Sequence, residues 1–176
     1  MNAGGHSSIP IRENAIYELA DALAKIRDHE FPVKMTDTTR AFFAKAGAAR
    51  GDDLGHAMLA LSQNPGDTAA EAMVSKDRSY HSTLRTTCVA TLLEGGHANN
   101  ALPQRAAANV NCRIFPGESV EGTQAALAAA IGDAGVKITP VQPIRPIAVP
   151  PPLDAKIIAP AEKLVAKYFP GVPLIP

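Results

Sequence analysis

The chain has 176 residues, a length that fits one domain, and 46% of them are hydrophobic while 19% are charged, which excludes wholesale disorder. Seventeen Lys and Arg residues balance seventeen Asp and Glu residues, so the composition lacks the basic excess of a nucleic-acid-binding protein. No apolar run approaches the roughly 18–20 residues that span a bilayer. We therefore expect a soluble protein without a nucleic-acid or membrane partner, and its compartment stays open between cytoplasm and periplasm.

The first part of the chain is predicted to be helical. Residues 14–29 carry apolar side chains at spacings of three and four, with Asn14 as N-cap and charged residues on the opposite face. The apolar positions are Ile16, Leu19, Leu23 and Ile26. Residues 36–73 then predict two or three shorter helices, because alanine-rich runs follow capping and turn residues.

The hydrophobic pattern then changes to one typical of strands. Residues 86–93 are rich in β-branched side chains, and residues 105–115 alternate between apolar and polar side chains. In the second segment one face carries Ala106, Ala108, Val110, Cys112 and Ile114, and the other face carries Arg105, Asn109, Asn111, Arg113 and an exposed end of Phe115. A sheet with one apolar and one polar face is typical of antiparallel strands that are covered by helices on one side only.

The two cysteines, Cys88 and Cys112, fall one in each of these strand-like segments. A single pair is far from the cysteine density of a disulfide scaffold. Free cysteine is among the residue types most often buried, so we interpret both as small buried hydrophobic residues.

Further elements are predicted beyond the second strand. Ser119 is expected to cap a helix that ends at about residue 133, with Gly135 in the position of a C-terminal glycine cap. Residues 136–139 predict a short additional strand.

The C-terminal region begins with a proline-rich stretch. Six prolines between residues 140 and 152 predict an extended, stiff connector instead of a helix or strand. Residues 153–169 predict a helix that is interrupted or restarted at Pro160.

The predicted elements follow the order helix, helical insertion, strand, strand, helix and strand. This order indicates a ferredoxin-like α+β fold, an antiparallel sheet with helices on one face, with a helical insertion after the first helix and without its first strand. We therefore expect residues 1–139 to form one domain, with the insertion at about 33–84. Because the first strand would need residues upstream of Met1, we interpret the chain as a truncated piece of a longer protein.

The sequence contains no self-sufficient catalytic motif. The five histidines show none of the spacings of a metal site, and neither His-x-Asp nor Cys-x-x-Cys is present. No Gly-x-Ser-x-Gly motif supports a serine nucleophile. We therefore expect no metal site within this chain. The histidines are His6, His29, His56, His81 and His97.

Two short segments are candidates for a function. In residues 4–10 a histidine follows two glycines shortly before a helix, and in residues 95–103 a glycine-rich loop with amide side chains leads into the strand that carries Arg113. Spacing alone favours a simple interpretation of both segments, namely turns and a solvated sheet face.

Together, however, these segments resemble the lid, or dimerisation, domain of di-zinc exopeptidases and amidohydrolases. Residues 4–10 are similar to the start of that lid, and residues 85–117, with Asn-Ala-Leu-Pro and Asn-Cys-Arg, are similar to its second signature. The similarity is greatest to the carboxypeptidase S-like branch of a family that includes carnosinase, aminoacylase, acetylornithine deacetylase and succinyl-diaminopimelate desuccinylase. The lid of that branch often has a helical insertion, and residues 140–152 and 153–176 would lead back to the catalytic domain.

The resemblance implies roles for three residues of this chain. His6 matches the lid histidine that, in a homodimer, enters the active site of the partner subunit and hydrogen-bonds the oxyanion of the tetrahedral intermediate. Asn100 matches a lid asparagine that contacts substrate. Arg113 matches the lid arginine that binds the substrate carboxylate, for which a guanidinium offers two parallel hydrogen bonds. His97 matches no functional residue of the family, and we expect it to be structural.

The resemblance also implies two zinc ions in a catalytic domain whose ligands and general base this chain does not contain. The first hypothesis is a lid fragment, inactive alone, of a zinc-dependent enzyme that hydrolyses peptides or N-acyl amino acids. The alternative is a stand-alone ferredoxin-like binding or assembly module with the open sheet face as its interface. A third hypothesis, an independent hydrolase, requires amidase activity from this chain with added zinc, and we expect none.

Overall fold

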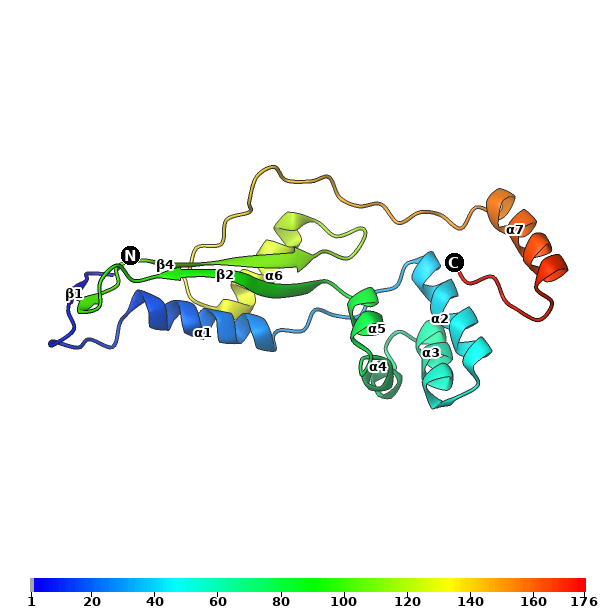
Figure 1. Ribbon diagram of the computed structural model, residues 1–176, viewed down its shortest axis with the longest axis horizontal. Coiled ribbons are helices and arrows are strands. Elements are labelled where there is room, and N and C mark those ends of the chain that lie inside the picture. The colour runs from blue at the N-terminus through cyan, green and yellow to red at the C-terminus, as the bar shows by residue number, and fades with distance from the viewer. Residues whose placement is uncertain (1) are drawn as a thin grey trace. The chain divides into compact units, whose positions relative to one another are not determined.

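The computed structural model describes residues 2–176, which divide into two compact units (Figure 1). Unit 1 consists of residues 2–31, 86–114 and 118–147, and unit 2 consists of residues 32–85, 115–117 and 148–176. Each unit has a hydrophobic core of its own.

The centre of unit 1 is a two-stranded antiparallel sheet. β2 (Thr87–Gly95) pairs with β4 (Ala106–Arg113) in a register that sets the start of β2 opposite the end of β4. A bulge between Ala90 and Leu92 inserts one unpaired residue into β2. Both strands lie where the hydrophobic pattern predicted them.

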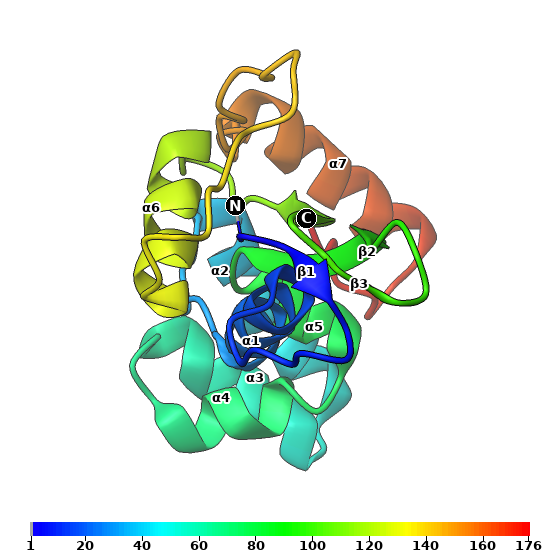
Figure 2. The ribbon, with the colours of Figure 1, turned by 90° about the vertical axis from the view of Figure 1, so that its left-hand side faces the viewer.

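Two helices, α1 (Ala15–Asp28) and α6 (Val120–Ile131), cover one face of this sheet and contact each other (Figure 2). The buried core consists of Ala22, Ile26, Phe31, Leu127 and Ile131, with Cys88, Val110 and Cys112 of the sheet packed against it. On β4, Val110 packs towards this core whereas Asn111 and Arg113 are exposed, so the predicted alternation is confirmed there. Phe115, which follows the strand, is buried, so the prediction of an exposed Phe115 is wrong. The predicted α+β class is confirmed as well.

The capping residues set the ends of both helices. The Asn14 side-chain oxygen accepts a hydrogen bond from the Ile16 N–H at 2.9 Å, as expected of an N-cap, and Ser119 caps α6 in the same way. At its other end α6 stops at Gly132, which has the left-handed φ of 62°. The C-terminal glycine cap is therefore Gly132, and the prediction of Gly135 is wrong.

Residues 136–139, predicted as a strand, form no strand in the structure. Val136 and Ile138 still pack against the core, and the Ile138 carbonyl oxygen accepts a hydrogen bond from Nε2 of Gln124 at 3.0 Å. In a ferredoxin-like sheet the last strand pairs with the first, and none of residues 2–176 forms a strand in that place. The segment therefore has no ladder to join, and a side chain of α6 satisfies its backbone acceptor.

Cys88 and Cys112 form a disulfide bond, so their interpretation as two free buried residues is wrong. The register of β2 and β4 sets the two residues directly opposite each other, with Cα atoms 4.1 Å apart. The sequence places each cysteine in a strand but does not show the register. That register depends on the bulge between Ala90 and Leu92, which lies between Cys88 and the connecting loop.

Unit 2 is built mainly from short helices in the predicted insertion. They are α2 (Asp37–Arg50), α3 (Asp53–Gln63), α4 (Thr68–Val74) and α5 (Arg78–Thr83). Their core consists of Phe43, Ala46, Met58, Leu61, Ala70, Val74 and Leu84. Three helices over residues 36–73 agree with the prediction, whereas α5 was not predicted, because few of its six residues are good helix formers.

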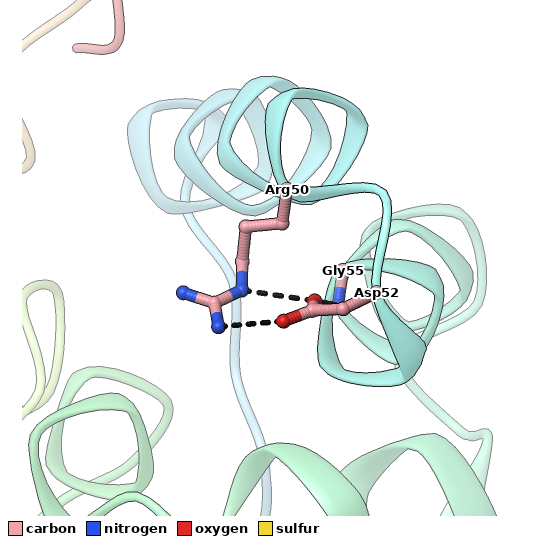
Figure 3. A network of polar contacts seen from close by, with 3 residues as sticks. All are labelled: Arg50, Asp52 and Gly55. Carbon is pink, nitrogen blue, oxygen red and sulfur yellow. Dashed lines mark hydrogen bonds and ion pairs between the residues drawn. The ribbon is translucent and has the colours of Figure 1, made fainter.

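The turn between α2 and α3 is fixed by polar contacts (Figure 3). Gly51 ends α2 with a left-handed φ of 69°, and the Asp52 carboxylate then caps α3 by accepting the Gly55 N–H at 2.8 Å. Arg50 donates two hydrogen bonds to the same carboxylate, from Nε at 3.1 Å and from Nη2 at 2.8 Å. The hydrogen bonds from Arg50 and then from Gly55 lower the pKa of the Asp52 carboxyl below 3.8.

The C-terminal part of unit 2 contains α7 (Ala155–Tyr168), which Asp154 caps. The helix passes through Pro160 without interruption, so the predicted break is wrong. Pro160 lies in the second turn, where its missing N–H removes a single hydrogen bond of the helix. An ion pair of 2.6 Å between Lys45 and Glu162 links α7 to α2. None of the helices in residues 2–176 combines the length and apolar character that crossing a membrane requires.

Candidate functional site

The two candidate segments of the sequence meet in unit 1. β1 (Gly5–His6) pairs antiparallel with β3 (Ala101–Leu102), with His6 opposite Ala101. The Ser7 N–H also donates a hydrogen bond to the Asn100 carbonyl oxygen at 2.9 Å. The fold therefore brings together two of the predicted site residues, His6 and Asn100, which are 94 positions apart in the chain.

Two glycines determine the path of the chain into β1. Gly4 has φ 75° and Gly5 has φ 149°, which residues with a side chain rarely adopt. A Cβ on Gly4 would also lie 2.9 Å from the side chain of Gln104, whose Nε2 donates a hydrogen bond to the Ala3 carbonyl at 3.2 Å. The Gly-Gly pair thus lets the N-terminal segment approach β3 and place His6 beside it.

The His6 imidazole has a polar neighbour at each ring nitrogen. Its Nε2 lies 3.2 Å from Nδ2 of Asn100. Its Nδ1 lies 2.7 Å from the Ser8 hydroxyl oxygen and accepts a hydrogen bond from the Ser8 N–H at 3.2 Å. All three residues are exposed, so the ring is held in one direction and stays accessible to a molecule from outside.

Ser8 is the residue of this site that sequence reasoning missed. The sequence contains no Gly-x-Ser-x-Gly motif that would single it out as a nucleophile. Its role could have been predicted from its position two residues after the histidine, because the glycines of this segment indicate a tight turn.

Arg113 is not brought to this site. It is exposed at the end of β4, opposite the first residue of β2, whereas the β1–β3 pair lies near the end where β4 begins (Figure 1). β4 has eight residues, so at about 3.3 Å per residue its two ends are about 23 Å apart. The three predicted residues therefore occupy two separate places on unit 1.

No metal centre is found in the described part of the chain. Among residues 2–176, no three His, Cys, Asp or Glu side chains gather into a group that could hold a metal ion. His97 lies exposed in the loop between β2 and β3, and its structural role stays a prediction.

A shallow depression of about 700 Å³ lies in unit 2, lined by α2, α7 and the C-terminal segment. Its charged side chains, Lys45 and Glu162, are paired with each other. The other lining residues are apolar or glycine, so the depression offers neither a nucleophile nor an unpaired acid or base. The exposed cluster of His6 and Asn100 is therefore the better candidate for a functional site.

Residues 2–139 match the model of a family described as the peptidase dimerisation domain. The chain belongs to this family. The match spans both segments that carried the resemblance in the sequence and confirms it. It extends a little beyond α6 and ends where the proline-rich stretch begins.

Two curated proteins are similar to this peptidase dimerisation domain. "Probable carboxypeptidase S-like 2" of Dictyostelium discoideum is 28% identical over 173 residues, which is 98% of this chain and 33% of that protein. "N-fatty-acyl-amino acid synthase/hydrolase PM20D1.1" of Danio rerio is 25% identical over 146 residues, 82% of this chain and 28% of that protein. The chain thus spans about a third of the length of these relatives. No solved structure matches it significantly.

Proposed function

We propose that this peptidase dimerisation domain is the lid of a homodimeric, zinc-dependent exopeptidase or amidohydrolase that cleaves peptides or N-acyl amino acids. In this proposal residues 1–139 form the lid, residues 140–152 the connector and residues 153–176 the return to a catalytic domain. The observation that carries it is the contact between His6 and Asn100, because the fold joins the two residues whose roles the family resemblance implies.

His6 would stabilise the oxyanion of the tetrahedral intermediate. Its imidazole is exposed and held at both nitrogens, so it can donate a hydrogen bond to an incoming oxygen without first having to be ordered. One such donor is worth about 3–4 kcal/mol of the activation barrier. Asn100 lies beside it and would contact the same substrate.

Arg113 would bind the substrate carboxylate, but the distance along β4 separates it from His6. In a dipeptide or an N-acyl amino acid the carboxylate lies only a few bonds from the scissile carbonyl, so one substrate cannot place these two groups at opposite ends of a strand that spans about 23 Å. In a symmetric dimer this separation is resolved if one active site receives Arg113 from its own lid and His6 and Asn100 from the partner lid. The dimerisation-domain match supports this arrangement.

The zinc ions of the proposed enzyme would not be held by this chain. The described residues do not fit such a site, because no suitable group of three ligands is formed among them. Both ions would need ligands from other parts of a longer protein, and the chain alone would be inactive. The share of the relatives that this chain covers, 33% and 28%, leaves room for a catalytic domain of that kind.

The proposal is tested by His6→Ala in the full-length protein that carries this chain, with His97→Ala as the matched control. We expect His6→Ala to lower kcat by about 100-fold to 1,000-fold while zinc content and the unfolding temperature stay unchanged. His97→Ala should keep wild-type turnover. Normal turnover by a folded, zinc-loaded His6→Ala protein would refute the proposed role of His6.

A further inference from the structure

We infer that Ser8 is a positioning residue that holds the neutral His6 ring in the tautomer with its proton on Nε2. The inference about the tautomer depends only on the contacts of this chain. Its meaning for catalysis rests on the proposed function of His6. Ser8 acts through two groups, its backbone N–H and its hydroxyl, and both face the same ring nitrogen.

The backbone N–H of Ser8 decides which ring nitrogen is protonated. It points at Nδ1 of His6, with the two nitrogen atoms 3.2 Å apart. A backbone N–H can only donate, so the atom that it faces must offer a lone pair. A proton on Nδ1 would set two N–H groups head to head at this distance. The neutral ring therefore carries its proton on Nε2.

The Ser8 hydroxyl acts in the same direction. Its oxygen lies 2.7 Å from Nδ1, and a hydroxyl can either donate or accept. Because the neighbouring N–H already requires Nδ1 to be an acceptor, the hydroxyl is left to donate. The Ile9 N–H closes this turn on the His6 carbonyl oxygen at 3.0 Å, so Ser8 is held beside the ring by local backbone structure.

A proton on Nε2 of His6 also determines the orientation of the Asn100 side chain. A proton on Nε2 needs an acceptor, and the amide group of Asn100 lies 3.2 Å away. Oxygen and nitrogen exchange places when an amide is turned by half a rotation, and only the hydrogen-bond network distinguishes them. The structure sets Nδ2 of Asn100 against Nε2, so the inferred tautomer requires this amide to be turned by half a rotation, with its oxygen as the acceptor that an oxyanion would replace.

This tautomer is the one that oxyanion stabilisation requires. The other neutral tautomer would present the lone pair of Nε2 to a negatively charged oxygen and repel it. A partner on one ring nitrogen commonly fixes the tautomer and the direction of the other nitrogen. Ser8 would thus keep a neutral donor ready without the ring having to gain a proton.

The test begins with ¹⁵N nuclear magnetic resonance of the 176-residue chain, at a pH where the spectra show a neutral His6 ring. We expect a protonated Nε2, an unprotonated Nδ1, and a scalar coupling across the hydrogen bond from Ser8 N–H to Nδ1. A ring that is mainly protonated on Nδ1 would overturn the inference.

Variants of Ser8 test the contribution of its hydroxyl. Ser8→Ala keeps the backbone N–H but removes the hydroxyl, so the population with Nδ1 protonated should increase. Ser8→Thr keeps a hydroxyl at the same place and should restore the wild-type ratio. Ser7→Ala, which alters the neighbouring serine without touching Nδ1, should change nothing. An unchanged ratio in Ser8→Ala would overturn the role of the hydroxyl.

Turnover of the Ser8→Ala and His6→Ala variants distinguishes a failure of the role of Ser8 from a failure of the proposed function. In the full-length protein Ser8→Ala should lower kcat by about 10-fold with little change in KM, because the donor acts on the transition state. If His6→Ala keeps full turnover, the proposed function fails even where Ser8→Ala shifts the tautomer. If His6→Ala is inactive and Ser8→Ala changes neither the tautomer nor kcat, the inference about Ser8 fails alone.

Discussion

His6 and Arg113 lie at opposite ends of the β2–β4 sheet. His6 is paired with Ala101 near the end where β4 begins, and Arg113 is the last residue of β4. Both side chains are exposed, so each can reach a different molecule. A two-fold axis between two lids would turn this separation into two equivalent sites, each of which contains residues from both chains.

The first prediction is that two inactive variants restore activity when their subunits are mixed. His6→Ala and Arg113→Ala should each lower turnover of the proposed full-length homodimer to about a hundredth of wild type or less. In a heterodimer of the two, one active site has an intact Arg113 of its own and an intact His6 from its partner. After random exchange of subunits the mixture should reach about a quarter of wild-type turnover, since half of the dimers are mixed and each has one working site.

A second pair of variants is the control for this experiment. Asn100 contacts His6 on the same chain, so both should serve the same partner site. Mixing His6→Ala with Asn100→Ala leaves every active site with one of these residues missing, and turnover should not recover. Recovery in this control, or its absence in the first mixture when heterodimers are seen by mass spectrometry, would contradict the proposed arrangement.

Local features of the fold could be predicted from the sequence, whereas long-range relationships could not. The N-caps Asn14 and Ser119 and the alternation along β4 depend on neighbouring residues, and they are found where the pattern placed them. The pairing of Cys88 with Cys112 depends on a register that passes through a bulge. Hydrophobic patterning does not encode that register.

In the candidate site, too, single residues could be predicted from the sequence but their contacts could not. The resemblance pointed to His6 and Asn100 separately, but only the pairing of β1 with β3 shows that they are neighbours. The role of Ser8, two residues after His6, depends on the turn that the Ile9 N–H closes on the His6 carbonyl oxygen and on the direction of the His6 ring, which a single sequence does not specify.

The disulfide bond should increase the free energy of unfolding. Cys88 and Cys112 are 24 positions apart, and the entropy that a disulfide removes from an unfolded loop of this length corresponds to a stabilisation of about 3.5 kcal/mol. The variant Cys88→Ala/Cys112→Ala should unfold at a lower urea concentration than the oxidised wild type. Reduced wild-type protein should behave like the variant. Equal midpoints for oxidised and reduced protein, with the bond verified by mass spectrometry, would contradict this expectation.

The ion pair between Arg50 and Asp52 predicts a pH dependence of unfolding. Hydrogen bonds from Arg50 and Gly55 lower the pKa of the folded-state carboxyl below its ordinary 3.8. A carboxyl with a lowered pKa stabilises the fold above its unfolded-state pKa, and this contribution is lost as the pH falls through the folded-state pKa.

Asp52→Asn isolates that contribution, because asparagine still caps α3 but cannot form the ion pair. The variant should melt slightly below the wild type at pH 7, with a small difference since both groups are exposed, and the difference should vanish in acid. Asp53→Asn removes a neighbouring negative charge but leaves the Arg50 pair intact, so it should not reproduce the loss of stability of Asp52→Asn at pH 7. A difference for Asp52→Asn that persists in acid would contradict the ion-pair explanation.

The close approach of α2 and α3 leaves no room for a side chain at Gly47 or at Gly55, which face each other across the two helices. A Cβ at Gly47 would lie 2.6 Å from the backbone oxygen of Gly55, an atom that cannot move without its helix. Gly47→Ala should therefore push the two helices apart and cost about 1–3 kcal/mol, although alanine is the better helix former.

Gly66→Ala is the matched control, because its nearest neighbour would be a side-chain oxygen of Asn64 at 3.4 Å and its φ is not in the left-handed region. Urea unfolding of both variants should show a clear loss for Gly47→Ala and little change for Gly66→Ala. Equal stability of the two would mean that the helices separate at no cost. In that case the core of Phe43, Met58 and Leu61, which α2 and α3 share, would not depend on their close contact.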